Sequence, residues 1–116
     1  MSREWILKTL AGLGLSEAEE AVYFFLAQKG PVKGKDIAKA LRFYTPQVYR
    51  ILKSLQAKRM VNSTYEHPAK FFAVPLEKVL DQFMKTKTEQ AMALQANKEG
   101  LLASWRSMIE KEPNDK

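Results

Sequence analysis

The side chains best suited to chemistry in this sequence are the polar residues between Pro46 and Ala57. When residues are placed about 100° apart, as in a helix, the apolar members of this segment cluster on one side, namely Val48, Ile51, Leu52 and Leu55. The opposite side carries small, amide and cationic side chains, namely Pro46, Gln47, Arg50, Lys53, Ser54 and Ala57. Arginine can bridge O6 and N7 of guanine, glutamine can pair with adenine, and serine or lysine can reach phosphate. The pattern is typical of a helix in the major groove of duplex DNA; an ordinary solvated helix face is the alternative.

Catalytic and metal-binding chemistry finds little support elsewhere in the chain. The sequence has no Cys, and its one His, His67, falls in an expected turn. Asp36 is the only acidic residue within 21–65, so this stretch offers no pair of carboxylates. Gly12 and Gly14 are not followed by the third glycine or the lysine of a phosphate-binding loop. We therefore expect no enzyme, no cofactor and no metal site.

The basic residues are concentrated in one part of the sequence. The 116-residue chain has a formal charge of +6. Residues 32–75 carry nine Lys and Arg against two acidic residues, a net charge of +7. Residues 1–31 carry three against four, a net −1, and residues 76–116 carry seven of each sign. A concentrated basic segment indicates a polyanionic partner, whereas an evenly spread charge mainly affects solubility.

Composition also limits where the protein works. The longest apolar run, residues 21–27, has seven residues, far fewer than the roughly 18 that a membrane span needs. The first residues lack the apolar segment of a secretory signal, and the absence of Cys removes disulfides. We expect a soluble cytoplasmic protein with no membrane partner.

Short helices joined by turns are expected to position the polar face. A helix over residues 34–41 is followed by a break, after which Thr45 as N-cap and Pro46 in the first turn begin a helix over 46–58. Two helices joined by three or four residues are typical of a helix-turn-helix. Upstream, residues 4–13 form a helix, and a capping box from Ser16 to Glu19 begins another that ends at Gly30.

A hairpin is expected directly after the helix-turn-helix. Residues 60–65 and 71–74 form two strands, and residues 66–70 form the polar turn between them. This order of elements is that of a winged helix, in which the hairpin is the wing. Tyr65, His67 and Lys70 then surround the wing tip, and Lys33 and Lys35 flank the start of a helix, where phosphate is favoured.

The last third of the chain predicts one long helix over residues 76–112, followed by a disordered tail at 113–116. Such a helix has about 37 residues and is roughly 55 Å long, too long to pack on a domain of about 75 residues. Its apolar positions recur at steps of three and four, which favours a coiled coil between two copies of the chain. The residues expected at this seam are Trp5, Leu80, Phe83, Leu94, Leu101, Trp105 and Met108. The alternative is a helix that breaks near Gly100 and folds back as a hairpin.

Several fragments of the sequence together resemble one known family. They are Leu13-Gly14-Leu15-Ser16-Glu17-Ala18-Glu19, Val22-Tyr23, Lys29-Gly30-Pro31, Asp36-Ile37-Ala38, Val48-Tyr49-Arg50-Ile51-Leu52-Lys53-Ser54-Leu55 and Phe72-Ala73-Val74-Pro75. Over residues 13–80 the chain resembles the archaeal TrmB-type transcriptional regulators. The resemblance implies a winged-helix DNA binder, often dimeric through a helix after the wing. It also implies that Thr45, Gln47, Arg50 and Ser54 lie on the surface that reads DNA.

The sequence departs from that family in two places. Full-length members carry a C-terminal sugar-binding domain, whereas this sequence ends after the expected long helix, so the resemblance gives no ground for a sugar ligand. In addition, the stretch Arg42-Phe43-Tyr44-Thr45-Pro46 replaces the usual small, glycine-containing turn.

These observations predict a mainly α protein of the α+β winged-helix class. Residues 1–75 form a winged helix-turn-helix domain with a two-stranded wing, and residues 76–112 form a dimerisation helix. The expected function is regulation of transcription by a homodimer that binds specific duplex DNA, with helix 46–58 in the major groove. The residues expected at the DNA backbone are Lys33, Lys35, Tyr44 and Lys53. The alternatives are a non-specific, chromatin-like DNA-binding protein and a winged helix used for protein–protein contact in a larger assembly.

Overall fold

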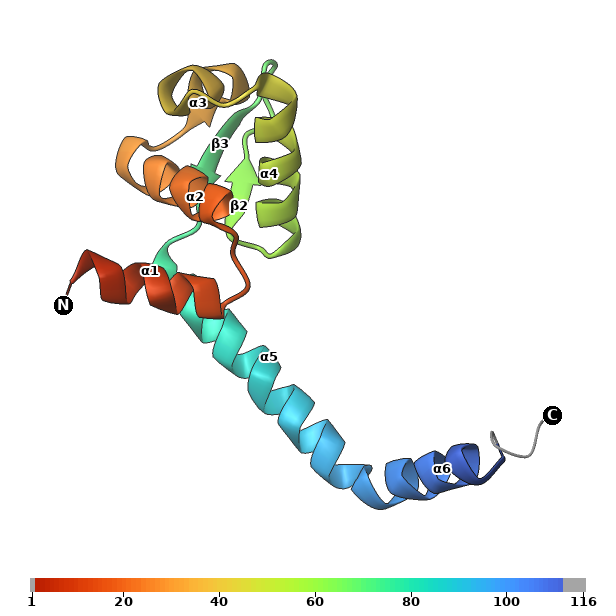
Figure 1. The fold of residues 1–116 in the computed structure, drawn as a ribbon. Helices are drawn as coiled ribbons and strands as arrows, with labels where there is room; N and C mark the ends of the chain where they lie inside the picture. Colours follow the sequence, from red (N-terminus) through yellow and green to blue (C-terminus); the bar gives the residue numbers. More distant parts are fainter. Residues whose placement is uncertain (1, 112–116) are drawn as a thin grey trace. The chain divides into compact units, whose positions relative to one another are not determined.

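The computed structural model describes residues 2–111, which fall into two compact units divided between Leu80 and Asp81. We call them the winged-helix unit (residues 1–80) and the C-terminal unit (residues 81–116) and describe each by itself. The elements, in chain order (Figure 1), are α1 (Arg3–Gly12), α2 (Glu17–Lys29), β1 (Val32–Lys33), α3 (Gly34–Leu41), α4 (Thr45–Ala57), β2 (Val61–Ser63), β3 (Lys70–Ala73), α5 (Leu76–Ala96) and α6 (Lys98–Lys111). None of the described helices is long and apolar enough to cross a membrane.

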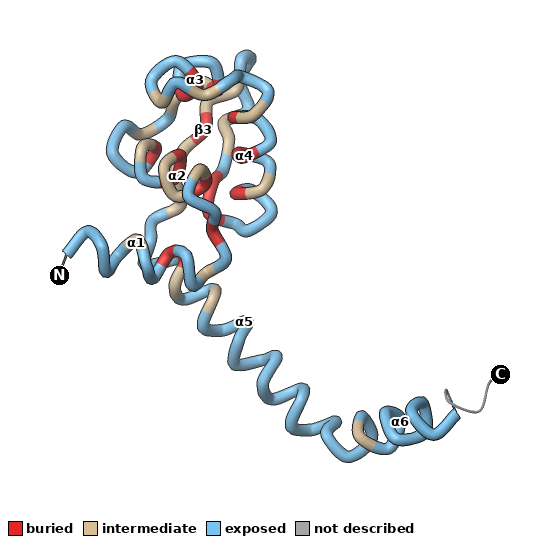
Figure 2. The backbone as a smooth tube through the Cα atoms, viewed as in Figure 1, coloured by how far each residue is buried: buried red, intermediate tan, exposed pale blue. Residues whose placement is uncertain are grey.

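The core of the winged-helix unit lies between α2, α3, α4 and the sheet (Figure 2). The apolar face expected for the recognition helix is confirmed, since the four apolar side chains of α4 are all buried, namely Val48, Ile51, Leu52 and Leu55. They pack against α2 and α3, whose buried members include Val22, Leu26 and Ile37. Because one face of α4 is fixed in this way, its opposite face is directed to solvent.

The helix-turn-helix consists of α3, the three-residue turn 42–44 and α4. The expectation that Thr45 is the N-cap is wrong, because α4 begins at Thr45 and Tyr44 occupies the cap position. The amide of Val48 donates to the carbonyl oxygen of Tyr44 at 3.0 Å, which starts the helix one residue early. Pro46 lies in the first turn, as expected. Arg42, which ends α3, adopts left-handed backbone angles with φ 61°.

The sheet has three antiparallel strands in the order β1–β3–β2. The expected hairpin is confirmed as β2 and β3. Strand β2 is shorter than predicted, and β3 begins and ends one residue earlier than predicted. The third strand, β1, was not predicted, because two residues carry no recognisable alternation. It pairs with β3 so that Val32 lies opposite Phe71 and Lys33 lies opposite Lys70. This pairing ties the start of α3 to the first residues of β3, next to the turn of the wing.

The single helix expected over 76–112 is present as two helices, α5 and α6, interrupted at Asn97. The Asn97 side chain donates from Nδ2 to the carbonyl oxygen of Ala93 at 2.8 Å, and its backbone amide donates to the same oxygen at 3.1 Å. An asparagine that binds the preceding turn in this way competes with the regular helix. The alternative weighed from the sequence placed the break near Gly100, which instead lies inside α6. The expected disordered tail at 113–116 lies outside the described residues.

Candidate nucleic-acid interface

The solvent-facing side of α4 carries two cations. Arg50 and Lys53 are both exposed, and neither forms an ion pair within residues 2–111. Thr45 is exposed at the first position of the helix, and Gln47 is half-buried beside it. The first two turns of α4 therefore present a hydroxyl, an amide and a guanidinium, the groups that hydrogen-bond to base edges and phosphates.

Ser54, predicted to contact bases, has a different partner in the structure. Its side chain is half-buried, and its hydroxyl donates to Oε2 of Glu19 in α2. On the helical wheel Ser54 lies at the border between the core side and the solvent side of α4. The structure therefore engages its hydroxyl in packing α4 against α2.

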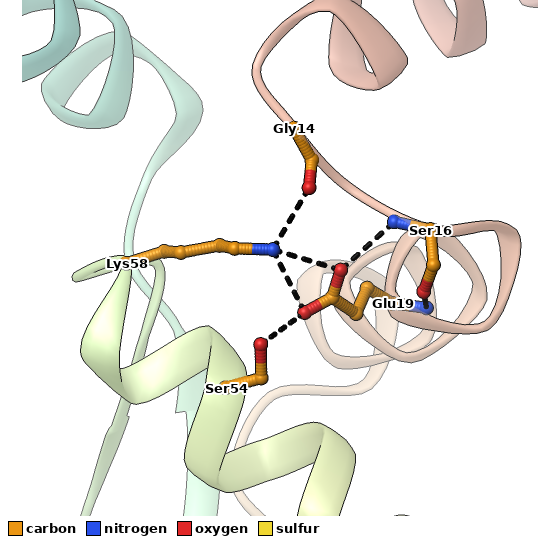
Figure 3. Close-up of polar contacts among 5 residues, drawn as sticks. All are labelled: Gly14, Ser16, Glu19, Ser54 and Lys58. Atoms are coloured by element: carbon orange, nitrogen blue, oxygen red, sulfur yellow. Dashed lines mark hydrogen bonds and ion pairs between the residues drawn. The ribbon is translucent and has the colours of Figure 1, made fainter. Parts of the chain in front are cut away.

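Glu19 is the centre of a polar cluster that joins the start of α2 to the end of α4 (Figure 3). Its carboxylate accepts from the amide of Ser16 at 2.8 Å and from Nζ of Lys58 at 2.9 and 3.0 Å. Nζ of Lys58 also donates to the carbonyl oxygen of Gly14 at 2.9 Å. We call these five residues, including Ser54, the Glu19 cluster. The predicted capping box of α2 is confirmed, because the amide of Glu19 donates to Oγ of Ser16 at 3.1 Å.

The Glu19 carboxylate is stabilised in its charged form although it is 6% exposed. Burial by itself raises the pKa of a carboxyl, but here hydrogen bonds from Ser54, Ser16 and Lys58, together with the charge of Lys58, act against it. The balance lowers the pKa of Glu19 from 4.5 to about 2. The sequence showed Glu19 only as part of a capping box, since its partner Lys58 lies 39 residues away.

Within residues 2–111, only two of the nine cations of residues 32–75 form an ion pair with an acidic residue. Lys58 binds Glu19, and Lys70 lies 3.8 Å from Oε1 of Glu66. The other seven form no ion pair in the described part of the chain, and they are Lys33, Lys35, Lys39, Arg42, Arg50, Lys53 and Arg59. The unpaired positive charge therefore lies mainly on α3, the turn and α4, where the sequence placed the candidate DNA-binding surface.

The structure places two lysines that are far apart in the sequence opposite each other. Lys33, expected at the DNA backbone, and Lys70, expected at the wing, are direct cross-strand partners in β1 and β3. Both are half-buried, whereas Lys35 in the first turn of α3 is exposed. Like charges placed directly opposite each other destabilise a strand pair. Glu66 pairs with Lys70, so Lys33 is the member of this pair without an acidic partner in the described chain.

Aromatic side chains flank the same surface. Tyr44 in the turn is 84% exposed, and Tyr65 at the wing is fully exposed, as is expected of side chains available to a partner. His67 is also exposed.

Tyr49 has a structural role that the sequence did not reveal. A Cβ at Gly34 would lie 2.5 Å from its ring, so the ring covers the start of α3 directly. The ring also packs edge-on against Phe71, with 6.1 Å between the centroids. Tyr49 therefore holds α4 to both α3 and β3.

The residues expected at a dimer seam remain largely uncovered in the single chain. Leu94 is 62% exposed and Trp105 is 56% exposed, and Trp5, Leu101 and Met108 are exposed to a similar extent. Leu80 and Phe83 are half-buried. Lys87, which interrupts the apolar stripe of α5, places Nζ 5.4 Å from the centre of the Phe83 ring, so its stem follows the stripe.

Comparison with known families agrees with this geometry. The model of the family described as the sugar-specific transcriptional regulator TrmB matches residues 10–77, more than half of the chain. The chain belongs to the TrmB family. The matched region covers α2, the helix-turn-helix and the wing, and it contains residues 13–77 of the resemblance noted in the sequence. Among curated proteins, no significant match to the chain was found.

Solved structures with a similar fold are winged-helix regulators. A possible transcriptional regulator from Methanosarcina mazei superposes with a TM-score of 0.59 at 15% identity, covering 86% of this chain and 88% of that one. The MepR–DNA complex of S. aureus gives 0.55 at 20% identity, covering 89% and 90%. A MarR-family regulator from Silicibacter pomeroyi gives 0.54 at 18%, covering 90% and 77%. At these identities the likeness shows the fold alone. This fold confirms the winged-helix class, and the matched structures with it are those of transcriptional regulators.

Proposed function

We propose that this TrmB-family protein regulates transcription by binding specific duplex DNA as a homodimer, occluding or recruiting polymerase. The observation that carries the proposal is the division of α4 into two faces. One face is buried in the core, and the other presents Arg50 and Lys53 without acidic partners in the described chain. A helix of this kind, second in a helix-turn-helix, suits the major groove.

The surroundings of α4 support a polyanionic partner. Lys33 and Lys70 lie opposite each other in the β1–β3 pair, and Lys35 follows at the start of α3. Phosphates bound there would pair with these lysines and would fix the orientation of the protein on the duplex. The MepR structure, which has the same fold, was solved as a DNA complex.

The exposed apolar side chains of the C-terminal unit support dimerisation. Within residues 81–111 no side chain is buried, although the helices present Leu94, Leu101, Trp105 and Met108. Most of the stability of a helix in a protein comes from packing of its apolar face, so these helices need an apolar partner. A second copy of the same helices supplies one, in a coiled coil. The dimer would place two copies of α4 on half-sites about 10 base pairs apart, or a multiple of this spacing.

The proposal is tested by selecting bound duplexes from a random pool and measuring the oligomeric state in the same buffer. We expect a dimer and the enrichment of a two-fold symmetric motif with half-sites one or more helical turns apart. Equal binding of selected and random duplexes would instead indicate a non-specific coating protein. The absence of any DNA binding would leave protein–protein contact as the role of the winged helix.

Two alanine substitutions separate base reading from phosphate binding. Arg50→Ala is expected to relax base preference at one position of each half-site, losing about 1–3 kcal/mol of discrimination. Lys35→Ala is expected to weaken binding to every sequence to the same extent. Binding titrations on the selected duplex and a random duplex measure both. Identical behaviour of the two variants would argue against a reading role for α4.

A pair of matched substitutions tests the dimer seam. Ala91 and Ala93 are both exposed in α5, but Ala91 lies on the side of the helix that carries Leu80 and Leu94, whereas Ala93 is turned about 160° away from Ala91. We expect Ala91→Glu to dissociate the dimer and to weaken binding to the selected duplex by about 100-fold or more, since one protomer then contacts one half-site. Ala93→Glu makes the same chemical change and should remain dimeric by light scattering. Dissociation by both variants, or by neither, would contradict the proposed seam.

A further inference from the structure

Arg42 occupies a backbone conformation that usually selects glycine. It ends α3 with φ 61° and ψ 41°, in the left-handed region. Side chains with a Cβ carry a steric penalty there, and glycine does not. Two other helix ends in this chain do use glycine, because Gly30 ends α2 with φ 78° and Gly14 follows α1 with φ 95°. The arginine at position 42 therefore costs stability that glycine would not cost.

No hydrogen bond or ion pair of the side chain compensates for this cost within the described chain. Arg42 is exposed, and its guanidinium forms no hydrogen bond or ion pair within residues 2–111. Its backbone amide donates to the carbonyl oxygen of Ala38, a bond that glycine would make equally well. Strained residues that persist without an internal reason are concentrated at functional sites.

The position of Arg42 indicates what the side chain is for. It lies in the turn of the helix-turn-helix, two residues before Tyr44 caps α4. In Figure 1 this turn and the wing tip lie at the same end of the winged-helix unit, next to the start of α4. When the first turns of a recognition helix meet base edges, the turn before it runs beside the DNA backbone.

We infer that Arg42 is a phosphate-binding residue, held in a left-handed conformation at a cost in folding stability. The inference rests on the proposed DNA binding by α4 and adds a contact that the sequence did not indicate. The guanidinium supplies charge and paired N–H donors to one phosphate, so it contributes affinity for any duplex and no base preference.

A second arginine provides a matched control. Arg59 also adopts a left-handed conformation, with φ 62°, is also exposed and also follows a helix C-terminus. A cation at a helix C-terminus interacts favourably with the helix dipole, and this effect applies to both residues. Arg59, however, lies beyond the far end of α4, about 20 Å along the helix from its first turn. Only Arg42 is placed to reach the DNA backbone.

The test uses the full chain and a random-sequence duplex of about 30 base pairs, because a phosphate contact does not require the preferred site. Arg42→Gly and Arg59→Gly should both raise the melting temperature, by about 3–6 °C, by removing the left-handed strain. Only Arg42→Gly should weaken DNA binding, by about threefold to tenfold. It should also reduce the slope of log K against log salt by about 0.9 for each bound protomer.

Two further variants separate binding from stability. Arg42→Ala keeps the strain and removes the charge, so it should bind as weakly as Arg42→Gly without the gain in melting temperature. Arg42→Lys should keep most of the affinity and the salt slope. The inference is overturned if Arg42→Gly binds with wild-type affinity and slope, or if Arg59→Gly loses binding equally. If the wild-type chain does not bind the duplex at all, the proposed function itself fails, and this result is visible before any variant is compared.

Discussion

The two units of this protein differ in how they use their apolar side chains. The winged-helix unit buries a continuous set that includes Val22, Leu26, Ile37 and Leu55. In the described part of the C-terminal unit every side chain is exposed or half-buried, and the tube in Figure 2 is almost entirely pale blue there. The sequence composition of the two parts does not show this contrast, because both contain leucine at helical spacing.

The difference indicates that the two units obtain their stability in different ways. The winged-helix unit has its own core and cross-links it with polar contacts such as the Glu19 cluster. The C-terminal unit consists of two helices whose apolar faces find no cover within the described chain. Folding of the first unit is therefore expected to be independent of protein concentration, whereas ordering of the second depends on a partner.

The contrast is tested most strongly by one substitution made in both units. Leu55→Ala, at a side chain with no exposure, should destabilise the winged-helix unit by about 3–5 kcal/mol, because it leaves a cavity in the core. Leu101→Ala, at a side chain 57% exposed, should leave that unfolding transition unchanged and weaken only self-association. Urea denaturation followed at several protein concentrations measures both effects. An equal loss of unfolding free energy in the two variants would show that the units share one core.

A second comparison, within the winged-helix unit, is between the stability contributions of the Lys58–Glu19 and Lys70–Glu66 ion pairs. Glu19→Gln should cost about 2–3 kcal/mol, because Lys58 and Ser54 lose a buried charged acceptor. Glu66→Gln changes an exposed pair 3.8 Å apart and should cost less than about 0.5 kcal/mol. Chemical denaturation near neutral pH measures the difference, and equal costs would contradict the assigned role of burial.

The pH dependence gives an independent check on Glu19. Since folding lowers the pKa of Glu19 from 4.5 to about 2, its contribution is fully present above about pH 5. The contribution is lost as the pH falls from there toward 2, because the proton then binds the unfolded state more readily. The stability difference between the wild type and Glu19→Gln should therefore shrink across this window. A difference that stays constant between pH 5 and 2.5 would contradict the lowered pKa.

The last prediction concerns a hydrogen bond on another side of the same core, whose removal should cost less unfolding free energy than Glu19→Gln. The Tyr23 hydroxyl donates to the carbonyl oxygen of Val74 at 2.6 Å, and burial raises the pKa of Tyr23 above its usual 10.0. Tyr23→Phe should cost about 1 kcal/mol by removing one hydrogen bond. Because this bond does not involve α4, DNA affinity should be unchanged when unfolding and DNA titrations are measured on the same sample. A loss of affinity would show that DNA binding depends on general stability as well as on the α4 surface.

Much of the winged-helix unit could be predicted from the sequence because its signals are local. The capping box at Ser16 and the apolar spacing of α4 each involve residues within one or two helical turns. The N-cap was misplaced by one residue, since Thr45 is a good cap by type but the backbone bond to Tyr44 begins the helix earlier. Strand β1 was missed because two residues become a strand only through pairing with β3.

The parts of the candidate site that could not be predicted depend on contacts between distant residues. Ser54 lies at the border of the helical wheel, and only the position of Glu19, 35 residues earlier, decides what its hydroxyl binds. Lys58 was counted in the basic excess although Glu19 neutralises it. To predict the break at Asn97 one would need to know that its side chain donates back to the carbonyl oxygen of Ala93. The residue type alone does not determine this contact.

The separation of the two faces of α4 has an evolutionary consequence. The residues that hold the helix in place, such as Leu52 and Leu55, are not the residues directed to solvent, such as Arg50 and Lys53. Mutations at the exposed positions can therefore accumulate with little effect on folding. If the proposed function holds, a duplicated copy of this protein could acquire a different target sequence by changing a few such side chains, while the scaffold stays the same.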